Sequence, residues 1–203
     1  HFNDSLHALH ASSIVRIRAN CHATTPKTST TISKPYRCYT PFIMILYEKD
    51  RGLYLNLTNR CPVSCSFCIK MPWDYQFEGH DLRLKGPEPT APALIAALKE
   101  KLDTSDYWRE VVYCGFGEST YRLEEMKKVG HYLKTQHPEL RQRLNTVGLG
   151  SLIWDRNITP ELASFLDEVA VSLNTADEKQ WVAMMQPAPA YRTSGFAASR
   201  LFV

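Results

Sequence analysis

The sequence predicts an α/β fold in which four strand–helix units form a partial (β/α) barrel around a parallel sheet. Three observations predict it. Segments with strand-like and helix-like patterns alternate four times between residues 52 and 185. The helical segments carry apolar residues on one face, and a glycine-rich or polar turn follows each strand. Because ligand sites of parallel α/β folds gather at the carboxyl ends of the strands, these turns predict one functional edge.

The four predicted strands span residues 52–59, 110–116, 143–149 and 168–175. In the first, Leu53, Leu55 and Leu57 alternate with Tyr54 and Asn56, which is the two-residue period of a strand. The others are short apolar or β-branched runs that stop at glycine or at a polar turn. Strands this short, each followed by a helical segment, favour parallel pairing through helical crossovers.

The four predicted helices span residues 89–102, 120–136, 159–168 and 177–185. Thr90 is a plausible N-cap of the first, and Leu94 and Leu98 recur at helical spacing behind it. The third opens on a Thr-Pro pair, a frequent helix start.

The two ends of the chain lack these patterns. Residues 1–43 are rich in Ser, Thr and Pro, and Asp4 is their single acidic residue. One interpretation of this composition is an organellar targeting peptide. The other is a poorly ordered extension, or upstream sequence translated ahead of Met44, and we favour this second interpretation. After residue 187 the periodicity decays, so we expect a core over 44–187 and an atypical tail over 188–203. A fourth strand with an unpaired edge is a liability, so we expect the barrel to be truncated after its fourth unit.

Bulk properties exclude several classes. The net charge is +3 and no Lys/Arg run is dense, so nucleic-acid binding is not indicated. No apolar stretch is long enough for a membrane span. The six cysteines accompany a normal apolar fraction of 44%, which favours thiols in a reducing compartment over a disulfide scaffold. We expect a cytoplasmic protein without a membrane partner.

Three of the cysteines, Cys61, Cys65 and Cys68, lie within eight positions just after the first predicted strand. A zinc site would need a fourth ligand, for which Cys114 or His80 is available, but no second cysteine pair accompanies them. A redox dithiol would leave Cys61 without a role, and three unreactive cysteines this close together would be unusual. A four-iron cluster with three protein ligands would leave one iron open for catalysis. That interpretation fits the spacing best, and zinc stays open.

The motif Cys61-x3-Cys65-x-Phe67-Cys68 resembles the cluster motif of the radical S-adenosylmethionine (SAM) superfamily. The resemblance implies a [4Fe–4S] cluster whose unligated iron chelates the amino and carboxylate groups of SAM. It also implies reductive cleavage of SAM to methionine and a 5′-deoxyadenosyl radical, which abstracts hydrogen from a substrate. The family fold is a full or partial (β/α) barrel, usually with six strands, and the four units here resemble its first four.

A second motif, "CGFGEST" at 114–120, resembles the Gly-Gly-Glu element of that family. The resemblance assigns Gly115, Gly117 and Glu118 to the SAM amino group, and Ser172 and Asn174 after the fourth strand to the SAM ribose. Glycines permit close backbone approach, and a carboxylate accepts hydrogen bonds from an ammonium group. The alternatives are a simple glycine turn with a solvated Glu118 and an ordinary polar strand end.

Residues 44–187 are most similar to the TatD-associated radical SAM proteins, from which they depart at Ser119, where Pro is usual, and at Val147, where Asn is usual. The resemblance implies a small electron donor of flavodoxin or ferredoxin type and a functional link to a TatD-type nuclease. It names neither a substrate nor catalytic residues beyond the cofactor contacts. The competing hypotheses are a zinc-stabilised binding module without redox chemistry and an inactive, truncated product.

Overall fold

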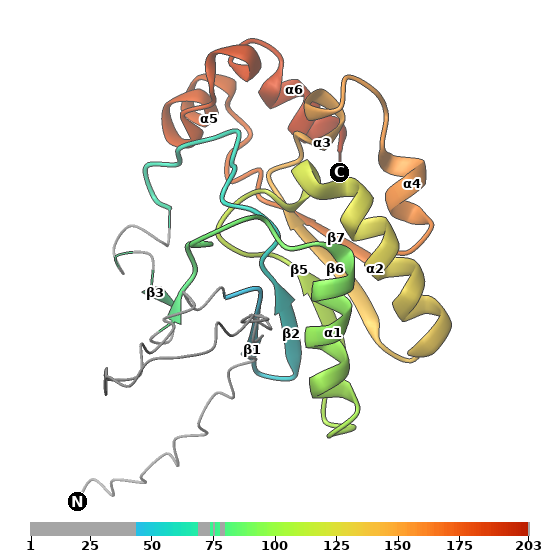
Figure 1. Ribbon diagram of the computed structural model, residues 1–203. Helices are drawn as coiled ribbons and strands as arrows, with labels where there is room; N and C mark the ends of the chain where they lie inside the picture. The colour runs from blue at the N-terminus through green and yellow to red at the C-terminus, as the bar shows by residue number, and fades with distance from the viewer. Residues whose placement is uncertain (1–43, 69–73, 75, 78–79, 203) are drawn as a thin grey trace, which may run out of the picture.

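A computed structural model describes residues 44–68, 74, 76–77 and 80–202 (Figure 1). Its centre is a five-stranded sheet in the order β1-β2-β5-β6-β7, and β2, β5, β6 and β7 are parallel neighbours. The strands are β1 (Leu46–Lys49), β2 (Gly52–Leu55), β5 (Glu110–Tyr113), β6 (Arg141–Thr146) and β7 (Glu168–Val171). The predicted α/β class and the four parallel strands are confirmed. The expectation for residues 1–43 lies outside the described residues.

The first strand of the sheet was not predicted. β1 pairs antiparallel with β2 through the two-residue connection Asp50–Arg51, and Asp50 has a left-handed φ of 53°. Two-residue hairpin connections need positive φ, which Asp tolerates better than most residues. The sheet is therefore mixed, because a local hairpin precedes the parallel strands.

Helices cover one face of the sheet. They are α1 (Ala91–Leu102), α2 (Leu123–Gln136) and the short α4 (Thr159–Ala163). Figure 1 shows α1 and α2 side by side in front of the strands. Leu94 and Leu98 of α1 and Met126 of α2 have no exposed surface and pack with Leu53 and Val111 of the sheet. Each such side chain contributes about 1.5–3 kcal/mol by leaving water, so this layer holds the strand order.

The carboxyl edge of the sheet is covered by a second group of elements, above the strands in Figure 1. They are η1 (Ser119–Arg122), α3 (Gly150–Ile153), α5 (Glu178–Met185), η2 (Pro189–Tyr191) and α6 (Gly195–Leu201). A separate two-stranded antiparallel sheet is formed by β3 (Gln76–Phe77) and β4 (His80–Asp81). This arrangement places α5 and α6 over the turns that the sequence marks as functional.

The atypical tail expected over 188–203 contains two helical segments, η2 and α6. Phe196 of α6 is 7% exposed and its ring centroid lies 6.1 Å from that of the buried Trp181 in α5. A helix of seven residues that opens on glycine carries too little periodicity to be read from sequence. The packed part of the chain therefore extends beyond residue 187.

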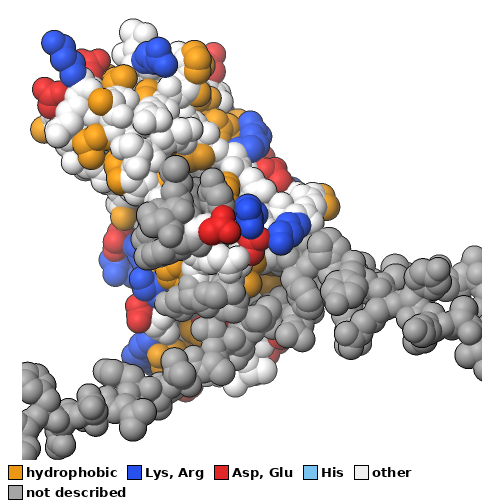
Figure 2. Space-filling model, turned by 90° about the vertical axis from the view of Figure 1, so that its left-hand side faces the viewer, with side chains coloured by type: hydrophobic (Ala, Val, Ile, Leu, Met, Phe, Trp, Pro, Cys, Tyr) orange, Lys and Arg blue, Asp and Glu red, His pale blue; other side chains and the backbone are white. Residues whose placement is uncertain are grey.

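The visible surface mixes positive and negative side chains instead of separating them by sign (Figure 2). Among the described side chains visible on that face, Lys and Arg are interspersed with Asp and Glu. Within the described ranges, no helix combines the length and apolar character needed to cross a membrane.

Candidate functional site

The three clustered cysteines lie on one loop at the carboxyl end of β2. None of them is in a disulfide; Cys61 is exposed, and Cys65 and Cys68 are partly buried. The Cys68 backbone N–H donates to the Cys65 carbonyl oxygen at 3.1 Å, which forms a turn between these two thiols. Phe67 within that turn is 46% exposed. The loop therefore carries three cysteines outside any disulfide at the edge that the sequence predicts to be functional.

The glycine turn after β5 packs directly against the start of this loop. The N–H of Gly117 donates to the Thr58 carbonyl at 2.9 Å, and the N–H of Glu118 donates to the Arg60 carbonyl at 2.8 Å. A Cβ on Gly117 would lie 2.6 Å from the Thr58 oxygen and nearer still to the Arg60 oxygen. A Cβ on Gly115 would likewise lie 2.6 Å from the Cα of Asn56. Both glycines are required for this close backbone approach.

Glu118 is buried, with 3% of its surface exposed, so the alternative of a solvated carboxylate is wrong. Its Oε1 accepts hydrogen bonds from the backbone N–H of Thr120 and from the hydroxyls of Thr120 and Thr146. Its Oε2 accepts one from the N–H of Val147 at 2.9 Å. The carboxylate therefore joins the turns that follow β5 and β6. Val147, where the resemblance leads one to expect Asn, contributes through its backbone.

Ser172 and Asn174 follow β7 and are both exposed. Asn174 has a left-handed φ of 64°, and its Nδ2 donates to the Ser172 carbonyl at 3.0 Å. The same Nδ2 lies 3.4 Å from the Sδ of Met185, and the Cys65 Sγ lies 3.6 Å from that sulfur. The structure thus brings Asn174 and Cys65 together through Met185. In the sequence Met185 is only an apolar position near the end of a predicted helix.

An aromatic group next to Cys61 was also missed. The Arg60 guanidinium lies over the ring of Tyr121 at 4.1 Å from its centroid. Burial, a hydrogen bond with Tyr191 and the nearby Cys61 raise the pKa of the Tyr121 phenol. Tyr121 comes from η1 and Tyr191 from η2, so these two segments meet beside the cysteine loop. Only the fold brings them together, since they are far apart in sequence.

By their chemistry, the thiols of Cys61, Cys65 and Cys68 are ligands of the type that hold iron–sulfur clusters, and none of them is in a disulfide. In the described part of the chain, no group of three or more His, Cys, Asp or Glu side chains is arranged to hold a metal ion. Burial raises the pKa of the Cys114 thiol, which hydrogen-bonds to Asn145 and Tyr47. The side chain of His80 lies outside the described residues.

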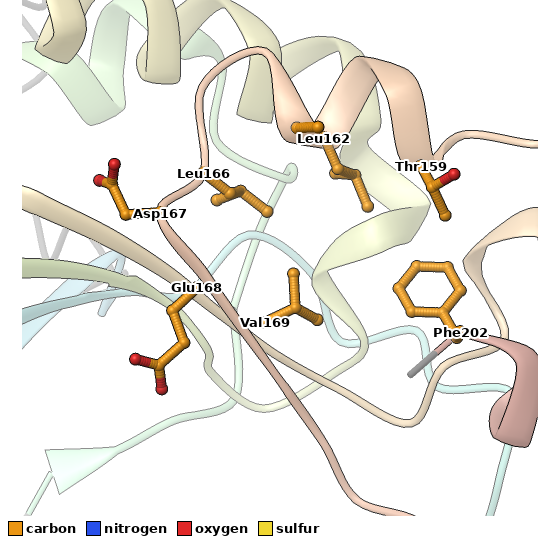
Figure 3. A pocket seen from close by; sticks show the side chains of 8 residues that line it. Thr159, Leu162, Leu166, Asp167, Glu168, Val169 and Phe202 are labelled. Atoms are coloured by element: carbon orange, nitrogen blue, oxygen red, sulfur yellow. The ribbon is translucent and has the colours of Figure 1, made fainter.

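A pocket of about 240 Å³ opens elsewhere, between α4 and β7 (Figure 3). It is lined by Thr159, Leu162, Ala163, Leu166, Asp167, Glu168, Val169 and Phe202. Asp167 and Glu168 lie at the amino end of β7, which is the end of the sheet opposite the cysteine loop. This pocket contains none of the predicted site residues.

No protein-family model matches the chain, and no curated protein matches it.

Proposed function

We propose that this chain is a radical SAM enzyme, or a fragment of one, in which Cys61, Cys65 and Cys68 ligate a [4Fe–4S] cluster. The main observation in support of this proposal is the contact between the cysteine loop, residues 58–68, and the Gly-x-Gly-Glu turn, residues 115–118. These motifs are about fifty residues apart in sequence, yet two backbone hydrogen bonds join them at neighbouring strand ends. A cluster loop and an ammonium-binding turn have to be adjacent if one cosubstrate is to contact both.

The chain's own groups have distinct roles in this proposal. The three thiolates hold three irons, and the bound cluster supplies the electron that cleaves the sulfonium of SAM. Among the hydrogen bonds of the described residues, Oε1 of Glu118 accepts three and Oε2 accepts one. Oε2 is therefore the oxygen with capacity for an ammonium hydrogen. The backbone of Gly117 allows close approach, and Ser172 and Asn174 present polar groups to a ribose.

The surroundings of the loop support the proposed partners. Cys61 and Phe67 are exposed, so one side of the loop faces solvent. A small electron donor of flavodoxin or ferredoxin type reaches the cluster from that side in our proposal. The absence of disulfides among the described cysteines fits the reducing, cytoplasmic compartment that we propose. The substrate, and any link to a TatD-type nuclease, belong to the same proposal through the family resemblance.

Anaerobic reconstitution with iron and sulfide tests the cluster. Wild-type protein and a C114A control should each bind about four irons per chain, whereas C61A/C65A/C68A should bind none. Reduction in the presence of SAM should then release 5′-deoxyadenosine from the first two proteins only. Four irons in the triple variant would refute the assignment of the ligands. About one zinc per chain after anaerobic purification would replace the proposal by a structural zinc module.

A further inference from the structure

The end of α5 is docked onto the cysteine loop by backbone hydrogen bonds. Residues 184–188 run alongside residues 62–66, with an antiparallel bridge between Val63 and Pro187. The hydrogen bonds are Ser64 N–H to the carbonyls of Met185 (3.0 Å) and Gln186 (3.1 Å), Ser66 N–H to Met184 (2.8 Å), and Ala188 N–H to Pro62 (2.9 Å). The last carbonyls of a helix have no partner within the helix, so the loop satisfies groups that would otherwise need water.

Met185 lies at the centre of this contact. Its side chain is fully buried, and its Sδ lies 3.6 Å from the Cys65 Sγ and 3.4 Å from the Asn174 Nδ2. Without a cluster, both partners are oriented to donate a hydrogen to the thioether, a weak acceptor. A Cys65 thiolate bound to iron would keep only the van der Waals contact with Met185, whereas the Asn174 amide would still donate its hydrogen bond. Asn174 also adopts a left-handed conformation, φ 64°, which Asn tolerates better than most residues.

The sheet alone cannot make this connection. Cys65 follows β2 and Asn174 follows β7, and β5 and β6 lie between these strands. Neighbouring strands are about 4.8 Å apart, so the two strands are about 14 Å apart. The cysteine loop and the turn after β7 extend beyond their strands into that gap, and α5 places Met185 between the Cys65 Sγ and the Asn174 Nδ2. Trp181 and Phe196 pack in the same apolar cluster as Met185 and hold the helix in place.

We propose that Met185 is a positioning residue, whose thioether holds Cys65 of the cluster loop and Asn174 of the ribose segment in one cosubstrate site. The inference rests on the proposed function, because it concerns how that site is assembled. Met185 acts through its two neighbours and not through SAM itself.

The first test uses reconstituted protein and the variant M185L, which keeps the side-chain volume and removes the sulfur. Met184 is the preceding residue of the same helix, so M184L is the matched control. M185L should retain the iron content of the wild type and bind SAM about tenfold more weakly, a difference of about 1.4 kcal/mol. The change that SAM causes in the electron paramagnetic resonance spectrum of the reduced cluster should also be altered. M184L should match the wild type in both measurements. A wild-type SAM Kd in M185L overturns the positioning role.

The second test needs no cluster, so the two proposals can fail separately. Iodoacetamide is added to the anaerobic apoprotein, and labelling of each cysteine is followed by peptide mass spectrometry. In M185A, Cys65 should be alkylated at least about tenfold faster than in the wild type, with Cys61 unchanged. Should M185A melt below the assay temperature, M185L takes its place with the same expectation. An unchanged Cys65 rate overturns the positioning role. If the wild type binds no iron, but Cys65 is still alkylated faster in M185A than in the wild type, the proposed function is refuted and the positioning role stands.

Discussion

Replacing Gly117 with alanine tests the junction on which the proposed function depends. The added Cβ would lie 2.6 Å from the Thr58 carbonyl oxygen and closer to that of Arg60. Both obstacles are backbone atoms, and they are the acceptors of the two hydrogen bonds that join the turn to the cysteine loop. Losing both bonds costs about 2 kcal/mol, and the overlap costs about as much again. The stiffer unfolded chain of an alanine variant offsets somewhat less than 1 kcal/mol. We therefore expect G117A to lower the free energy of unfolding by about 3 kcal/mol.

Urea unfolding followed by circular dichroism measures this loss, and G52A is the matched control. A Cβ on Gly52 would meet the ends of the Tyr54 and Glu110 side chains, at 2.9 and 3.2 Å, and these can rotate away. G52A should therefore stay within about 1 kcal/mol of the wild type. If G117A unfolded within about 0.5 kcal/mol of the wild type, the close approach of the two backbones would be refuted. G117A that folds at low temperature should also bind less iron, since its cysteine loop has lost its anchor.

Three further predictions concern buried or paired groups. E118Q should lower the free energy of unfolding by about 2–4 kcal/mol, because its amide nitrogen would face backbone N–H donors such as those of Thr120 and Val147. An unchanged urea midpoint would contradict the hydrogen-bond network around Glu118. Hydrogen bonding from Arg143 lowers the pKa of Glu110 below its usual 4.5. The ionised Glu110 therefore stabilises the folded protein fully above about pH 4.5, and this contribution is lost as the pH falls through the lower pKa of Glu110 in the folded state. The difference in Tm between wild type and E110Q should thus be largest near about pH 6 and shrink towards about pH 3, and a constant difference would argue against the pair. Burial raises the pKa of Cys114, so iodoacetamide should label it about tenfold more slowly than the exposed Cys61; equal rates would show that Cys114 is accessible.

Local patterns in the sequence were sufficient for the main elements of the domain. The alternation of Leu53 and Leu55 with Tyr54 predicted β2, and the spacing of Leu94 and Leu98 predicted α1, because a strand and a helix repeat every two and every 3.6 residues. The order of strands and helices also predicted the parallel pairing of β2, β5, β6 and β7. Short elements were not predicted from the sequence: β1 is four residues long, and α6 has seven residues and begins at glycine. Such pieces form because the rest of the molecule packs around them.

By itself, the sequence determined which residues could carry the chemistry. The spacing of Cys61, Cys65 and Cys68 and the turn around Gly117 are local features, and the end of a parallel strand brings each to the same edge. Only the tertiary structure decided how these residues are held. Glu118 is bound by donors from two turns, and Met185 reaches Cys65 across about 120 residues of chain. Contacts between distant segments depend on the packing of α5 and α6 over the sheet edge, and no local periodicity encodes that packing.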